Sequence, residues 1–155
     1  AINPYDYPGG IARSSLLARL IVTGVLAPGI GPVFARQEPK PVMRAVLRGG
    51  LVDTSALQED YLDELLNVGR RPGYPTVARA VYGNLPSLIA ARSRYTDVSA
   101  PIHLIYGEKD WSRPSDREAN RQLLPDAELT QVPNAGHFIA LERPDLPADL
   151  LNRPA

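Results

Sequence analysis

The chain contains no cysteine and has no excess of either charge. Without cysteine there can be no disulfide, no thiol nucleophile and no zinc site of the cysteine kind. The 17 lysine and arginine residues balance the 17 acidic residues, so no long-range field is available to hold nucleic acid or an anionic membrane surface. The composition therefore predicts no nucleic-acid partner, and the lack of thiols suits a cytoplasmic location.

Long hydrophobic runs are also lacking. The one uncharged stretch that raises a membrane question, residues 20–35, is shorter than the roughly 20 apolar residues of a spanning helix and is broken by glycine and proline. We expect it to form a buried or pocket-facing lid helix that ends at Pro28; a segment lying on a membrane surface is the alternative. No signal-peptide pattern follows Ala1, which we interpret as an artificial or fragmentary beginning.

What the chain does have is the composition of a globular protein, with 155 residues of which 44% are apolar. Its first hundred residues are dominated by helical periodicity. The first predicted helix is capped by Ser14 or Ser15 and carries an apolar stripe of Leu16, Leu17, Leu20 and Ile21. The others are one over residues 40–48, one that Asp53 or Thr54 caps and that ends near Gly69, and one over residues 76–95 that Pro86 interrupts.

From Pro101 the pattern changes to strand, helix, strand, helix. Residues 102–106 form a short apolar run that is typical of a strand buried on both faces, and residues 128–132 form a second strand. Ser115 or Asp116 can cap the helix between them, and residues 139–151 are helical but fragmented by two prolines. Parallel strands joined by a helix predict the α/β class. Two strands are too few for such a sheet, so its remainder must be missing or come from elsewhere.

Two polar side chains follow these two strands. Asp110 lies just beyond the end of the first strand, and His137 follows the second strand and Gly136. Open α/β sheets gather catalytic groups at the carboxyl ends of their strands, and neighbouring strands lie only about 4.8 Å apart. We therefore expect the carboxylate and the imidazole to meet there, although an acid in a turn and a lone histidine also occur as ordinary structural residues.

The segments PIHLIYGEKDW, LLPDAELTQVPNAGHF and ALERP resemble the last two strands of the α/β-hydrolase superfamily. This resemblance implies that Asp110 is the triad acid and His137 the triad base. It also implies a domain organisation for the chain. Residues 1–10 would be the end of a core strand and the entry to the cap, residues 11–98 the helical cap or lid, and residues 99–155 the C-terminal core segment.

The chain departs from the family in one large respect, because these enzymes carry their nucleophile on a G-x-S-x-G elbow, or an aspartate version of it, before the cap. None of the serines here has the flanking glycines; they are Ser14, Ser15, Ser55, Ser87, Ser93, Ser99, Ser112 and Ser115. Both the nucleophile and the oxyanion-hole loop are absent from the sequence, so we expect this chain alone to be inactive and to depend on a missing N-terminal half of the fold.

Several other residues are candidates for a lesser role. Asp6 follows the earlier strand and is the alternative triad acid. Tyr61, Tyr74 and Tyr82 lie where epoxide hydrolases use paired tyrosines, although tyrosine is also an ordinary packing residue. Trp111 either lines the pocket mouth or packs under the loop. We expect His103 to be structural and Glu142 to cap or tether the last helix.

The sequence thus predicts an α/β-hydrolase that acts on a small-molecule substrate without a cofactor. An ester-like substrate is the default, with His137 as general base and Asp110 as its orienting acid. An epoxide hydrolase or haloalkane dehalogenase is the enzymatic alternative. A non-catalytic remnant or pseudoenzyme, which would bind a partner through an unpaired sheet edge, is the alternative from another class.

Overall fold

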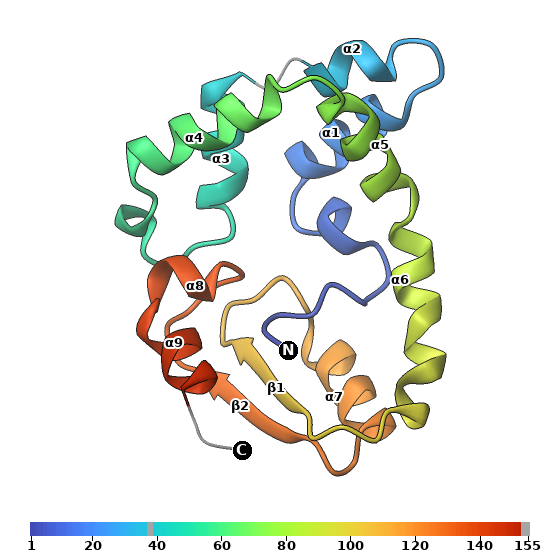
Figure 1. Ribbon diagram of the computed structural model, residues 1–155, viewed down its shortest axis with the longest axis vertical. Coiled ribbons are helices and arrows are strands. Elements are labelled where there is room, and N and C mark those ends of the chain that lie inside the picture. Colours follow the sequence, from blue (N-terminus) through green and yellow to red (C-terminus); the bar gives the residue numbers. More distant parts are fainter. Residues whose placement is uncertain (37–38, 153–155) are drawn as a thin grey trace.

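A computed structural model describes residues 1–36 and 39–152 of the chain (Figure 1). Its α-helices are α1 (Leu16–Leu26), α2 (Gly31–Arg36), α3 (Lys40–Arg48), α4 (Glu59–Gly69), α5 (Tyr74–Gly83), α6 (Leu85–Ala91), α7 (Pro114–Leu123), α8 (Ile139–Glu142) and α9 (Asp145–Leu151). Short 3-10 helices are η1 (Gly10–Arg13), η2 (Thr54–Ala56) and η3 (Arg92–Asp97), and the strands are β1 (His103–Gly107) and β2 (Glu128–Val132).

The two strands run parallel, and α7 connects them. Their register pairs His103 with Glu128 and Gly107 with Val132. The N-terminal segment adds a third position to this sheet, because Ile2 forms a parallel bridge with Ile105. The backbone N–H of Ile105 donates to the carbonyl oxygen of Ala1 at 2.9 Å, and its carbonyl accepts from the N–H of Asn3 at 2.8 Å. Strand β1 is therefore the central strand of the described sheet.

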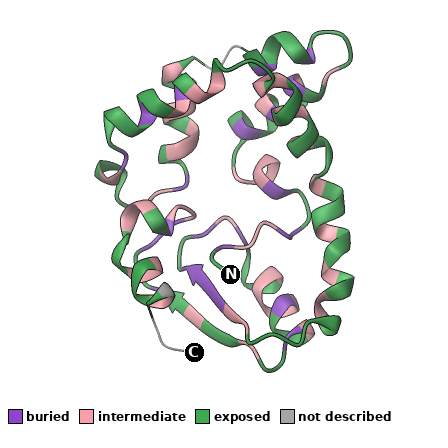
Figure 2. Ribbon diagram, in the orientation of Figure 1, coloured by how far each residue is buried: buried purple, intermediate pink, exposed green. Residues whose placement is uncertain are grey.

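Helices cover both faces of β1, which explains why its buried residues Leu104, Ile105 and Tyr106 are large and mostly apolar. On one face, Ile105 packs with Val132, Ala135 and Ile139 against α9. On the other face, Leu104, Tyr106 and Leu124 form a second cluster beside η3 and α7. Strand β1 is accordingly buried along most of its length, whereas β2 is largely exposed (Figure 2). Strand β2 lies at the edge of the sheet in the part of the chain that the structure describes.

The remaining helices lie beyond the carboxyl ends of the two strands (Figure 1). There α1, α2 and α5 pack together, α3 packs on α4, and α6 leads back to the sheet. Ser15 caps the N-terminus of helix α1, because its hydroxyl accepts from the N–H of Ala18 at 3.1 Å. Within the described residues, no helix combines the length and the apolar character that crossing a bilayer requires.

The structure corrects two local expectations. Helix α1 buries Ala18, Val22 and Val25, whereas Leu16 and Leu20 of the predicted apolar stripe are 73% and 62% exposed. Asp53 caps the short helix η2 by accepting from the N–H of Ser55, and the N-cap of α4 is Gln58. Asp53 thus caps a single 3-10 turn that ends before α4 begins. A local capping pattern does not tell the cap of a short turn from the cap of a longer helix.

Candidate active site

The carboxylate of Asp110 lies in the loop that leaves β1, and its side chain is fully shielded from solvent. Its Oδ2 accepts from the backbone N–H of Ser112 at 2.9 Å and also from the Ser112 hydroxyl. The guanidinium of Arg117 donates to that hydroxyl oxygen at 3.0 Å. Burial by itself disfavours the charged carboxylate, but the hydrogen bonds from His137 and Ser112 hold the pKa of Asp110 below its usual value. Asp110 is therefore ionised at neutral pH.

The imidazole of His137 meets Asp110 directly, with 2.5 Å between Nδ1 and Oδ1. The structure thus brings together the two residues that the sequence singles out. An ionised carboxylate can only accept a hydrogen bond, so Nδ1 carries the proton and donates it. In this tautomer Nε2 holds the lone pair that a general base needs.

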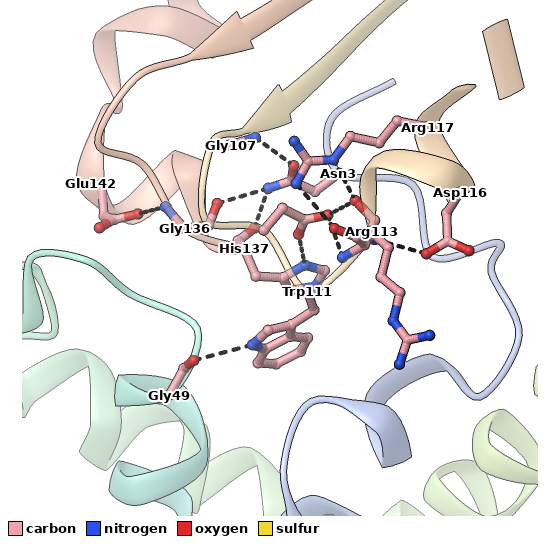
Figure 3. Close-up of polar contacts among 12 residues, drawn as sticks. Asn3, Gly49, Gly107, Trp111, Arg113, Asp116, Arg117, Gly136, His137 and Glu142 are labelled. Atoms are coloured by element: carbon pink, nitrogen blue, oxygen red, sulfur yellow. Dashed lines mark hydrogen bonds and ion pairs between the residues drawn. The ribbon is translucent and has the colours of Figure 1, made fainter. Parts of the chain in front are cut away.

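Aromatic rings hold the imidazole on several sides. The Trp111 ring stacks on it, with centroids 4.1 Å apart and planes 13° apart. Phe138 and Tyr5 approach it edge-on, with centroids 5.1 Å and 5.6 Å away. Trp111 is itself held, because its Nε1 donates to the carbonyl oxygen of Gly49 at 3.1 Å (Figure 3). The imidazole can therefore move little without displacing neighbouring rings.

The buried side chain of Asn3 links the acid loop to the histidine loop. Its Oδ1 accepts from the backbone N–H of Gly107 at 2.9 Å, and its Nδ2 donates to the carbonyl oxygens of Gly136 and His137 at 3.1 Å and 2.6 Å (Figure 3). The backbone φ of Asn3 is 40°, a region that asparagine adopts more readily than most residues. Asn3 therefore sets the separation of the two loops that carry Asp110 and His137.

We expect the substitution Asn3→Leu to destabilise the fold by about 2 kcal/mol, because three backbone groups would lose their partner in a buried place. Urea denaturation measures this loss. The same change at Asn67, which is exposed on α4, is the matched control and should leave the free energy of unfolding nearly unchanged. Equal effects at the two positions would contradict a linking role for Asn3.

The carboxylate of Glu142 attaches the histidine loop to the segment after α3. It accepts from the backbone N–H groups of Val52 and Asp53 through Oε1, at 2.6 Å and 2.8 Å, and from Gly136 through Oε2 at 2.6 Å. The N–H of His137 donates to the carbonyl oxygen of Gly50 at 2.7 Å. Glu142 thus ties the segment after α3 to the loop that carries His137.

The substitution Glu142→Gln should loosen this attachment, since an amide offers one acceptor oxygen where the carboxylate offers two. We expect hydrogen exchange to accelerate at the amides of Val52, Asp53 and Gly136 and to stay unchanged in β1. Glu118→Gln, at a position on α7 where the side chain is 46% exposed, provides the control. Exchange that rises equally in both variants would show that Glu142 has no special linking role.

Comparisons with known proteins give this geometry a context. No family model matches the chain. It is 22% identical over 152 residues to the sn-1-specific diacylglycerol lipase ABHD11 of Mus musculus, and the match covers 86% of this chain and 50% of that protein. The structure of Cfl2 from Burkholderia cenocepacia superposes with a TM-score of 0.67 at 18% identity, over 94% of this chain and 48% of that chain. The meta-cleavage product hydrolase CumD from Pseudomonas fluorescens IP01 superposes with a TM-score of 0.60 at 16% identity, over 81% of this chain and 48% of that chain.

These neighbours are α/β-hydrolases. This chain is folded as the C-terminal part of an α/β-hydrolase. The fold class inferred from the sequence is therefore confirmed, and the chain spans about half the length of the relatives that it matches. In this fold the loops after β1 and β2 bring their polar residues to one edge of the sheet.

Asp6, the alternative acid, belongs to a different cluster. Its carboxylate accepts from the Tyr95 hydroxyl at 2.5 Å and from Nδ2 of Asn120 at 2.9 Å. The same Nδ2 donates to the Tyr106 hydroxyl at 3.0 Å. Asp6 therefore binds η3 and α7 to the N-terminal segment, while the partner of His137 Nδ1 is Asp110.

The remaining candidate residues lie in three kinds of place. Tyr74 and Tyr82 line an apolar cavity among the helices beyond the sheet, whereas Tyr61 is 42% exposed on α4 and is not among the residues that line it. Trp111 stacks on the imidazole. His103 pairs its Nε2 with the Thr130 hydroxyl at 2.8 Å across the two strands, a structural contact.

Sequence reasoning missed Asn3, Ser112 and Gly50 as parts of the site. Asn3 and Gly50 reach His137 from more than eighty positions away in the chain, and no local pattern connects them to it. Ser112 could have been found, because a serine two residues after an aspartate often bonds the carboxylate.

Proposed function

We propose that this chain supplies the acid and the base of a hydrolase triad. His137 acts as the general base through Nε2, and Asp110 orients the ring and stabilises the imidazolium that forms when the base takes a proton. The observation that carries the proposal is the 2.5 Å contact between His137 Nδ1 and the solvent-shielded carboxylate of Asp110. The nucleophile and the oxyanion donors would come from residues outside this sequence.

An ester-like substrate fits the site and the relatives best. Two of the relatives are named as a diacylglycerol lipase and a meta-cleavage product hydrolase, which supports hydrolytic chemistry. In this reaction His137 would take the proton of the nucleophile as it attacks the carbonyl carbon, and would return that proton to the leaving oxygen. An aspartate nucleophile acting on a halide or an epoxide is the alternative within the same geometry.

The proposal requires a nucleophile outside this sequence, and the reading frame upstream of Ala1 tests that requirement. An in-frame G-x-S-x-G or G-x-D-x-G supports a hydrolase and also tells the two nucleophiles apart. A start codon at this point would instead favour the second candidate, a non-catalytic module. The exposed edge strand β2 favours that candidate, since an edge strand offers unpaired backbone groups to a partner.

The proposal also requires that turnover depend on His137, and kinetic measurements test this. The chain alone should not hydrolyse an aryl acetate faster than buffer does. A longer protein that contains both this chain and the nucleophile, called the joined protein below, should hydrolyse it. The substitution His137→Ala should abolish this turnover, whereas His103→Ala, which changes the other histidine of the chain, should preserve it. Turnover by the joined protein that survives His137→Ala would overturn the proposed role.

A further inference from the structure

The helical cap contains a cavity whose lining includes Phe138, the residue next to His137. Its volume is about 570 Å³, within the range of about 300 to 1,000 Å³ that is usual for small-molecule sites. Helices α1, α2 and α3 form most of its wall, and residues of α4 and α5 complete it. Phe138 also lines it, and its ring lies 5.1 Å from the imidazole of His137.

The side chains that line this cavity are nearly all apolar. All of its lining residues except Tyr74 and Tyr82 have side chains without a charge, an N–H or an O–H group. A charged or strongly polar ligand would lose its hydration there with little compensation, so it would bind weakly. An alkyl chain loses only contact with water, which favours its entry.

The cavity also has an apolar rim at the surface. Leu20, Val33 and Phe34 line it and are nonetheless 62%, 55% and 51% exposed. These side chains lie on α1 and α2, where the sequence has no acidic residue from Tyr7 to Arg36. The apolar lining therefore extends from the surface of the cap to Phe138, whose ring packs edge-on against the imidazole of His137.

We propose that this cavity binds the acyl chain of a medium- to long-chain ester, with the carbonyl carbon beside His137 and the alkyl chain extending among α1, α2 and α3. The inference rests on the function proposed above and names the substrate class of that site. Binding of the acyl product, a fatty acid, requires the cavity but no nucleophile. It can therefore be measured separately from catalysis.

Isothermal titration of the protein with butyrate, octanoate, dodecanoate and hexadecanoate tests the proposal. We expect the affinity to rise about fourfold for each methylene group that enters the cavity and to level off once the cavity is full. Affinity that does not depend on chain length, or a triol such as glycerol binding as tightly as octanoate, would overturn the inference.

Two variants locate the binding. Val46 on α3 lines the cavity, so Val46→Phe should weaken hexadecanoate binding about tenfold or more and leave butyrate binding nearly unchanged. The matched control is Val77→Phe, at a position on α5 that is 60% exposed and outside the lining. Equal losses in the two phenylalanine variants would overturn the inference.

A second change keeps the test decisive if Val46→Phe fails to give a cooperative thermal transition. Met43→Ala enlarges the same wall and should move the levelling-off of affinity to a longer chain. Chain-length-dependent binding without any ester hydrolysis in the joined protein would refute the proposed function and keep the acyl site. Hydrolysis of short esters without any preference for chain length would refute the acyl site and keep the proposed function.

Discussion

Replacing Asp110 by asparagine will lower kcat by about four orders of magnitude in the protein that joins this chain to its nucleophile, while KM changes little. The carboxylate of Asp110 accepts from His137 Nδ1 at 2.5 Å, and an amide at that place can donate to Nδ1 and select the other tautomer. Nε2 would then carry the proton and could not act as a base. Steady-state kinetics with an aryl ester measure the effect.

The matched variant is Asp6→Asn, because Asp6 and Asp110 are the two buried acids among the residues that the structure describes. Its carboxylate bonds Tyr95 and Asn120, so this change should lower the stability of the fold and leave the kcat of the folded fraction within about tenfold of the original. A larger loss of kcat in Asp6→Asn than in Asp110→Asn would transfer the acid role to Asp6.

The second large effect is expected at Gly136. A Cβ atom on this residue would lie 2.3 Å from the carbonyl oxygen of Gly50 and 3.0 Å from its carbonyl carbon. That contact involves backbone on both sides, and the N–H of His137 also donates to the Gly50 oxygen. Gly136→Ala must therefore push the histidine loop away from the cap, at a cost of about 3 kcal/mol or more in the free energy of unfolding.

Thermal and urea denaturation measure this loss, with Gly83→Ala as the control. Gly83 lies in the last turn of α5, and the atom nearest to a Cβ added there would be a leucine methyl at 3.9 Å. Alanine at this position should be neutral or stabilising by up to about 1 kcal/mol, because it favours the helix over the unfolded chain. A Gly136→Ala variant as stable as Gly83→Ala would show that the contact with Gly50 is dispensable.

Local sequence patterns predicted the elements whose cause is local. Helix α3 begins and ends where its apolar spacing and its proline indicate, and β2 occupies the predicted residues. Strand β1 is buried from Leu104 onward, as its largely apolar sequence indicates. The patterns also placed Asp110 and His137, since each follows a strand directly and parallel strands bring those positions together.

What the patterns did not give depends on tertiary contacts. The apolar stripe of α1 is only partly buried, because the smaller side chains Ala18 and Val22 face the neighbouring helices. Periodicity alone does not say which side of an apolar stripe is covered. Asn3 and Glu142 are supporting residues because distant backbone groups converge on them. No spacing in the sequence predicts that these backbone groups lie close to the two side chains.

The proposed role of Asp110 is to hold His137 with the proton on Nδ1 and the lone pair on Nε2. Nitrogen-15 NMR of the two histidines tests this directly, with His103 as the internal reference. We predict that the His137 ring is protonated at Nδ1, with a low-field proton signal that disappears in Asp110→Asn and persists in Asp6→Asn. A His137 ring protonated at Nε2 in the unmodified protein, or a signal that is indifferent to Asp110→Asn, would contradict this role.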